Sequence, residues 1–239
     1  MCGRYVRRSD KQRIAEHFHA RGVGAELPVP DADYNVAPTT HQPIIRQSKE
    51  NGERELILAR WGLVPFFSKD LKSVKGLSTI NARAETIVTA PTWREPFKKR
   101  RCLVPASAFY EWPKEGKAPK QPYAFELSNG DLFAFAGLWD AWKDGQGHWL
   151  QSFAIVTTEA NELMARIHPR MSVILHARDY DRWLDREETE RLPLDLLRPF
   201  ESDAMEMYEA NPKVNNVRNN GPELLRQVVE AAESGSLPL

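Results

Sequence analysis

The 239-residue sequence predicts an α+β fold, a single compact domain with an antiparallel, open-barrel-like strand core and peripheral helices. Hairpin signals occur repeatedly between residues 42 and 157, and helical patterns lie at both ends and between the strands. No repeat or low-complexity linker divides the chain. We therefore expect one domain over residues 1–233, followed by a flexible tail over residues 234–239.

The N-terminal half begins with a short strand over residues 3–6. Ser9, with Gln12 three residues later, has the pattern of a capping box and predicts a helix that ends at Gly22. Asn51-Gly52 separates two apolar-rich runs, residues 42–47 and 55–61, and predicts a β-hairpin. The segment Ile80 to Glu85 leads into a short helical stretch, and residues 91–97 predict another helical turn.

In the C-terminal half, residues 101–105 and 108–112 predict two strands, the first with Cys102 as a buried, inert thiol. A second hairpin is predicted for residues 122–127 and 132–139 around Asn129-Gly130, and Asp144-Gly145 marks a third turn. Further strands are expected at 152–157 and 172–175, with helical segments at 159–167, 179–184, 195–197 and 224–232.

The composition limits the class of protein. The 33 basic residues balance the 33 acidic ones, so binding of a polyanion requires a local concentration of charge. The two cysteines form neither a disulfide framework nor a zinc pattern, and no glycine-rich phosphate loop follows a strand, so no metal or cofactor is expected. With neither an apolar membrane span nor a signal peptide, we expect a cytoplasmic monomer, associated with the nucleoid in a bacterium or located in the nucleus of a eukaryote.

The residue that suggests chemistry is Cys2, which follows a removable initiator methionine. Removal of Met1 would leave an α-amine with a pKa near ~8 and a thiol near ~8.5 on the same residue. Both are nucleophiles near neutral pH, and together they can close on an aldehyde, first as a Schiff base and then as a thiazolidine ring.

Other polar residues could assist such a nucleophile. Glu111 is flanked by aromatic residues, so burial would raise its pKa and suit it to proton transfer, although a solvent-facing glutamate is equally compatible with the sequence. His168 could move protons and Asn81 could hold an amine or an oxygen, although structural roles are common for both types. The arginines near these candidates suit a phosphate-bearing substrate: Arg4, Arg83 and Arg170. One proline and three aromatic residues could stack on bases or pack in the core: Pro38, Trp61, Phe66 and Phe67.

The ordered motifs together resemble the SRAP family, the SOS response-associated peptidases, which sense abasic sites in DNA. The matching stretches extend from residue 2 to about residue 220. They are Met1-Cys2-Gly3-Arg4-Tyr5, Tyr34 to Thr39, Trp61 to Pro65, Ile80 to Thr86, Arg101 to Pro105, Phe109 to Trp112, Phe135 to Trp139, Thr157 to Asn161, Ile167 to Met171 and Val214 to Val217.

The resemblance implies a compact α+β domain with a positively charged groove for single-stranded DNA that contains an abasic site. It also implies that Met1 is removed and that Cys2 forms a thiazolidine DNA–protein crosslink with the ring-opened sugar, shielding the lesion. Asn81 would hold the Cys2 end, Glu111 would be the catalytic glutamate, and His168 would assist ring opening and proton transfer. The positions that match DNA contacts in the family are Arg4, Arg83 and Arg170 for phosphates, and Pro38 and Phe67 for a wedge between bases.

Three departures from the family pattern affect fine contacts. Phe66-Phe67 stand where relatives commonly carry tryptophan, Pro169 replaces the acidic residue often found between His168 and Arg170, and Ser172 stands where proline is frequent. Three further activities stay open from the sequence: a peptidase, an N-terminal-cysteine amidotransferase, and a non-covalent reader of damaged or modified DNA.

Overall fold

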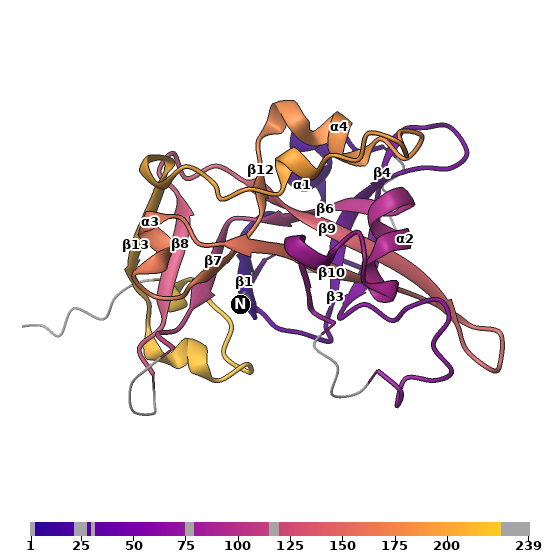
Figure 1. Ribbon diagram of the computed structural model, residues 1–239. Helices are drawn as coiled ribbons and strands as arrows, with labels where there is room; N and C mark the ends of the chain where they lie inside the picture. Colours follow the sequence, from indigo (N-terminus) through magenta and orange to yellow (C-terminus); the bar gives the residue numbers. More distant parts are fainter. Residues whose placement is uncertain (1–2, 22–27, 30–31, 75–78, 115–119, 226–239) are drawn as a thin grey trace, which may run out of the picture.

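The computed structural model describes residues 3–21, 28–29, 32–74, 79–114 and 120–225 (Figure 1). Cys2 and the predicted tail therefore lie outside the described residues, as does most of the helix predicted at 224–232. None of the helices within the described ranges is long and apolar enough to cross a membrane. The strands form two sheets, and the order of strands confirms the single α+β domain predicted from the sequence.

The larger sheet closes into a five-stranded barrel. Its circuit runs β10–β4–β3–β6–β9 and returns to β10, and β5, β11 and β12 extend it at the edges. All pairings within the circuit are antiparallel except that of β4 with β10, which is parallel and turns the expected open barrel into a closed one. The strands are β3 (His41–Gln47), β4 (Arg54–Trp61), β5 (Asn81–Arg83), β6 (Arg101–Ala106), β9 (Phe133–Lys143), β10 (Trp149–Glu159), β11 (Arg170–Ser172) and β12 (Ile174–Leu175).

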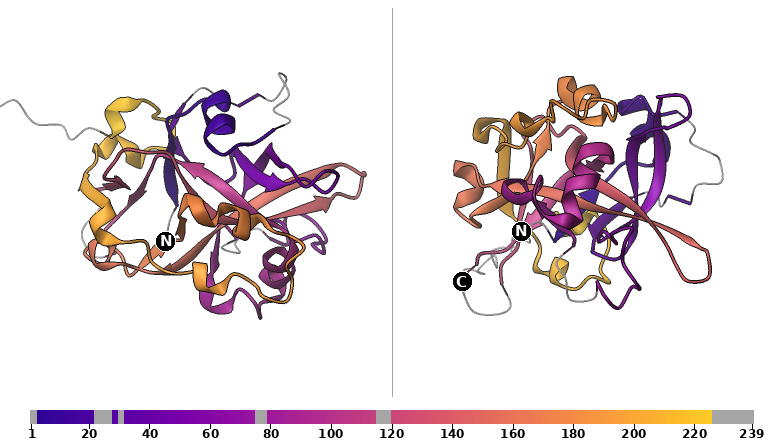
Figure 2. Two further views of the ribbon diagram at one scale, coloured as in Figure 1. Left: turned by 90° about the horizontal axis from the view of Figure 1, so that it is seen from above. Right: turned by 45° about the vertical axis from the view of Figure 1, so that its right-hand side comes forward.

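Glycine permits two features of this barrel. Gly52 lies in the β3–β4 turn with φ +72°, a left-handed conformation that favours glycine, and confirms the predicted hairpin. Gly137 on β9 faces Cys102 on β6, and a Cβ atom at Gly137 would lie 2.7 Å from the Cys102 sulfur. Any side chain there would push β6 and β9 apart. The turn predicted at Asp144-Gly145 is also confirmed, and the β9–β10 hairpin that it joins extends away from the body of the molecule in Figure 1 and in the right-hand view of Figure 2.

The second sheet has five antiparallel strands in the order β13-β8-β7-β1-β2. Its strands are β1 (Arg4–Arg7), β2 (Asp33–Val36), β7 (Ala108–Glu111), β8 (Tyr123–Leu127) and β13 (Met205–Glu209). The hairpin predicted around Asn129-Gly130 is wrong. The Gly130 amide does donate to the Leu127 carbonyl in a turn, but β8 pairs with β7 and β13, whereas β9 enters the barrel.

Successive side chains of the barrel strands point to opposite faces, and each face packs against a different layer of the molecule. One set, with Ile45, Leu103 and Leu138, packs against helices α1 (Lys11–His17), α2 (Pro91–Lys99) and α4 (Tyr180–Leu184). The other set, with Ile44 and Val104, packs against Tyr5 and other apolar side chains of the five-stranded sheet. This alternation is the period of two expected of strands buried on both faces.

The short helical elements correct two predicted boundaries. Helix α1 is capped by Asp10, whose side chain accepts from the Arg13 amide, rather than by Ser9. The helix expected at 159–167 is shorter than predicted, because β10 continues to Glu159 and helix α3 covers only Glu162–Ala165, capped by Asn161. The remaining single turns are 3₁₀ helices: η1 (Ala84–Thr86), η2 (Ala177–Asp179), η3 (Leu194–Leu196), η4 (Ser202–Ala204), η5 (Pro212–Asn215) and η6 (Pro222–Leu224).

Candidate functional site

Glu111 ends strand β7 beside the beginning of the described chain. Arg4 pairs with Tyr110, the residue before Glu111, and Gly3 is the first residue that the structure describes. The Glu111 side chain is only 6% exposed, and burial raises the pKa of its carboxyl group. A carboxyl group with a raised pKa can donate and accept protons closer to neutral pH than an exposed glutamate can.

Asn81 begins strand β5, which adds to the barrel by parallel pairing with β10. Its side chain is buried. The same strand carries Arg83 two residues later, opposite Thr157, and the Arg83 side chain is exposed. Strand β5 thus holds one buried amide and one outward guanidinium at the same edge of the barrel.

His168 lies in the turn between α3 and β11. The backbone N–H of Arg170 donates to its Nδ1 at 3.0 Å, and the Arg170 carbonyl oxygen lies 3.1 Å from the same atom. The N–H contact suits an unprotonated Nδ1 and the carbonyl contact a protonated one, so the Arg170 backbone can hold the ring in either neutral tautomer. Burial lowers the pKa of His168, and the positive charges of Lys114 and Arg170 lower it further. The imidazole is thereby favoured in its neutral form, which can accept a proton.

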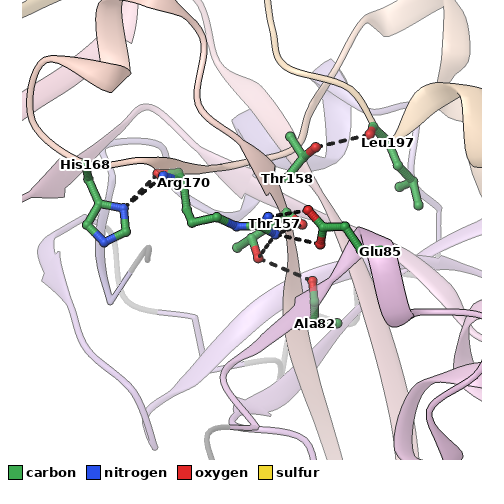
Figure 3. A network of polar contacts seen from close by, with 7 residues as sticks. All are labelled: Ala82, Glu85, Thr157, Thr158, His168, Arg170 and Leu197. Atoms are coloured by element: carbon green, nitrogen blue, oxygen red, sulfur yellow. Dashed lines mark hydrogen bonds and ion pairs between the residues drawn. The ribbon is translucent and has the colours of Figure 1, made fainter.

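The Arg170 side chain runs across β10 to the surface element η1 (Figure 3). Both of its terminal nitrogens bind the carboxylate of Glu85, and Nη2 also donates to the Thr157 carbonyl oxygen at 2.9 Å. This ion pair lowers the pKa of Glu85, chiefly through the hydrogen bond from Arg170. Glu85 belongs to the sequence motif around Arg83, but no sequence pattern indicates that it pairs with an arginine 85 residues away.

Arg4 is held from two sides. Its Nη1 donates to the Asn35 side-chain oxygen at 2.6 Å and to the Val214 carbonyl at 2.8 Å. The guanidinium carbon lies 5.7 Å from the ring centre of Trp112, and the Trp112 indole donates to Asn215 at 2.7 Å. Asn35 and Trp112 are functional candidates as anchors of Arg4, a role that the sequence did not reveal because their partners lie far along the chain.

The aromatic loop after β4 presents both of its phenylalanine rings. Phe66 and Phe67 are each 56% exposed, so the alternative of a core-packing corner is wrong for these two side chains. Three hydrogen bonds fix the loop backbone: Val64 N to Ser152 Oγ at 2.8 Å, Phe66 N to Asp140 Oδ2 at 3.0 Å, and the Trp142 indole to Ser68 O at 2.7 Å.

Asp140 is buried and also faces Arg100, whose Nε lies 3.2 Å from Asp140 Oδ1. Burial raises the pKa of Asp140, while the charge of Arg100 opposes that shift. Arg100 in turn lies 5.9 Å from the Phe66 ring centre. The exposed rings therefore lie over an ion pair between buried Asp140 and half-buried Arg100, an arrangement that suits a rigid stacking surface.

Trp61 connects the two sheets beneath the candidate residues. Its ring lies 5.2 Å from that of Tyr5, next to Arg4, and its indole donates to the carbonyl of Ile80, next to Asn81. The Thr39 amide donates to the Trp61 carbonyl, which brings the half-buried Pro38 to the start of the aromatic loop. The structure thus links the segments carrying Arg4, Pro38, Asn81 and Phe67 through one core side chain.

Known proteins are similar to this chain in sequence and in fold. Abasic site processing protein YoqW of Bacillus subtilis is 40% identical over 228 residues, covering 94% of this chain and 99% of that protein. Abasic site processing protein HMCES of Gallus gallus is 34% identical over 221 residues, covering 80% of this chain and 65% of that protein. A crystal structure of a protein from Bacteroides thetaiotaomicron superposes with a TM-score of 0.85 at 28% identity, covering 95% of this chain and 100% of the other.

The family model for SOS response associated peptidase (SRAP) matches residues 1–217. That range includes every candidate residue discussed above, from Cys2 to Arg170. The chain belongs to the SRAP family.

Proposed function

We propose that this protein processes abasic sites in DNA, and that it does so by forming a covalent thiazolidine link between Cys2 and the lesion in single-stranded DNA. The observation that supports the proposal most directly is the buried Glu111 beside the first described residues of the chain. The names of the relatives, which are abasic site processing proteins, support the choice of lesion.

The proposed reaction begins after Met1 has been removed. The α-amine of Cys2 adds to the C1′ aldehyde of the ring-opened deoxyribose and forms a carbinolamine. Loss of the hydroxyl group as water gives an imine, and the Cys2 thiol adds to the imine carbon while the nitrogen takes up a proton. One C–N bond and one C–S bond form, one water leaves, and no oxidant or reductant is needed.

Several described residues have suitable roles in this sequence. Glu111, with its raised pKa, would protonate the departing hydroxyl group and take a proton back from the thiol. His168, favoured as neutral imidazole, would take the hydroxyl proton of the closed sugar and so promote ring opening. Asn81 would hold the amine or the sugar oxygen from the edge of the barrel.

DNA binding is proposed for the surface around these groups. Arg83 is exposed on β5, and Arg4 is held by Asn35 and Val214, so both can present guanidinium groups to phosphates. Phe66 and Phe67 offer exposed rings to unstacked bases, with Pro38 next to them. Stacking on such rings requires unpaired bases, which supports single-stranded DNA as the target. We propose that the protein binds it as a monomer.

The test is denaturing electrophoresis and intact mass spectrometry of the Met1-free protein with a single-stranded oligonucleotide that contains an abasic site. We expect an adduct with the mass of protein plus DNA minus one water, which survives heating without borohydride because the ring is closed. Cys2→Ala and an oligonucleotide with a reduced abasic sugar are the controls, and both should give no adduct. A wild-type protein that stays unshifted, or an adduct that persists in Cys2→Ala, would refute the mechanism.

The remaining activities are outcomes of related assays. Ammonia release from glutamine would indicate an amidotransferase, and cleavage of peptides by the Met1-free protein would indicate a peptidase. Binding that is equal for wild type and Cys2→Ala and is lost on denaturation would indicate a non-covalent reader.

A further inference from the structure

The guanidinium group of Arg170 is already engaged by an acidic side chain of the same protein. A guanidinium offers two bidentate faces to an anion, Nη1 with Nη2 and Nε with Nη2, so both faces need Nη2. The two hydrogens of Nη2 point to Glu85 Oε2 at 3.0 Å and to the Thr157 carbonyl oxygen at 2.9 Å (Figure 3). Arg170 therefore has no bidentate face open to a phosphate while Glu85 stays in place.

Glu85 is suited to leave that position. Its side chain is 54% exposed, and it lies on η1, a single 3₁₀ turn without a side-chain cap. Water solvates the Glu85 carboxylate well once it separates, whereas the Arg170 side chain is only 20% exposed and its guanidinium gains from a new anion in the same place. Thr157, by contrast, contacts Arg170 through the carbonyl oxygen of a strand in the barrel, so it would stay in place.

We infer that Glu85 is an internal competitor for Arg170, a carboxylate that occupies the guanidinium in the free protein and exchanges with a backbone phosphate of bound DNA. This inference deepens the proposed function and rests on DNA being the target. The exchange makes binding weaker than the arginine alone would permit. A DNA strand that contacts no other part of the site therefore gains little binding energy from Arg170. The exchange thus lowers the affinity of the protein for undamaged DNA.

The contacts of Arg170 separate binding from chemistry. Its backbone N–H holds His168 Nδ1 at 3.0 Å, and its backbone pairs with Glu159 on β10. Neither contact involves the guanidinium group, so release of Glu85 leaves the imidazole in position. Loss of Glu85 should therefore change the affinity for DNA and leave the rate of adduct formation at saturating DNA unchanged.

The experiment measures the Kd by fluorescence anisotropy with a single-stranded oligonucleotide that carries a reduced abasic sugar, which cannot form the adduct. We expect Glu85→Gln to bind about three- to fivefold more tightly, the range of an exposed ion pair. The slope of log affinity against log salt should stay close to that of wild type, because the wild-type complex neutralises the same phosphate after the exchange. In an Arg170→Gln background, Glu85→Gln should have no effect on the Kd.

The matched control is Glu159→Gln. Glu159 is exposed on β10 and pairs with Arg170 through the backbone, whereas the Arg170 guanidinium bonds to Glu85 and Thr157, so the substitution removes one negative charge nearby and leaves the exchange intact. Its Kd should stay within about 1.5-fold of wild type, as expected for screened surface charges. Thermal unfolding of each variant verifies that it is folded.

The outcomes distinguish this inference from the proposed function. Unchanged or weaker binding by Glu85→Gln, or equal tightening in the Arg170→Gln background, overturns the competitor role even if wild type forms the adduct. Tighter binding that depends on Arg170 supports it even if no adduct forms and the covalent mechanism fails. Absence of DNA binding by every variant refutes both.

Discussion

Asn35 should be one of the most sensitive positions of this fold outside the apolar core. It is buried on β2, and its side chain joins the start of the chain to the segment near residue 214. Its Oδ1 accepts from Arg4 at 2.6 Å, and its Nδ2 donates to the carbonyl oxygens of Asn219 at 2.8 Å and Asn216 at 3.0 Å. Asn35→Ala removes these three contacts, and a longer one from Nδ2 to the Val214 carbonyl oxygen at 3.4 Å, and leaves their partners to find water.

The magnitude follows from these contacts. A hydrogen bond to a charged group contributes about 1.5–3 kcal/mol, and each amide–carbonyl bond about 0.5–1.5 kcal/mol. Arg4 keeps its bond to the Val214 carbonyl, and the surface carbonyls can be rehydrated, so the lower half of the sum applies. We expect the free energy of unfolding to fall by about 3 kcal/mol, which corresponds to roughly 6–12 °C in Tm for a chain of this length.

Chemical denaturation and thermal melts measure this loss. Asn35→Asp separates the contribution of the Arg4 contact from that of the carbonyl contacts. It keeps an oxygen that accepts from Arg4, and it places a second oxygen against the carbonyl groups of Asn216 and Asn219. Asn51→Ala is the control, since Asn51 is an exposed turn residue whose side chain contacts only Glu53, and its effect should stay below about 1 kcal/mol. An Asn35→Ala protein as stable as the Asn51→Ala protein would refute the reasoning.

Three further predictions concern the site. Burial raises the pKa of Glu111 in the folded protein, so ionisation of this carboxyl group destabilises the fold as the pH rises from 4.5, the pKa in the unfolded chain, through the higher folded pKa. Glu111→Gln should therefore have a higher Tm than wild type at pH ~8, and the difference should vanish below pH ~4. The same variant should form the adduct more slowly. A melting difference that does not depend on pH would contradict this. Phe67→Ala should weaken binding to single-stranded DNA by about 1–3 kcal/mol with Tm unchanged, as anisotropy and melts would show, and equal affinity would exclude a stacking role. Asp140→Ala removes the acceptor of the Phe66 amide and the partner of Arg100. The free energy of unfolding should fall by about 2–4 kcal/mol, and the affinity for DNA should fall although both phenylalanine rings remain. Melting and binding that match wild type would show that Asp140 is not needed to hold the loop.

Local turn chemistry explains which parts of the fold could be predicted. Asn51-Gly52 and Asp144-Gly145 reverse the chain between strands that then pair with each other. Asn129-Gly130 reverses the chain equally well, but the strands on either side enter different sheets. A turn motif determines the direction of the chain and does not determine the partner of each strand. The parallel pairing of β4 with β10 is likewise set by tertiary packing, since no short connection links those strands.

The same distinction applies to the site. The motifs identified Glu111, His168 and Arg170 because the order of residues in those stretches is distinctive. They did not identify the partners of these residues, since Glu85 and Arg170, or Asn35 and Asn219, meet only after the sheets have formed. Burial of Glu111 was equally beyond the sequence, because a strand residue flanked by aromatic side chains can face either side of a sheet.

The position of β1 within its sheet has a consequence for how the protein is made. Although it is first in sequence, β1 lies between β7 and β2, and Arg4 pairs with Tyr110 and bonds to Val214. Ribosomes add about 5–20 residues per second, so roughly 5–20 s pass between synthesis of β1 and that of its partner β7. During that interval β1 cannot be enclosed between its neighbours, and an aminopeptidase on the nascent chain has access to Met1. The order of synthesis therefore favours the removal of Met1 that the proposed mechanism requires, before the strand that follows it is locked into the sheet.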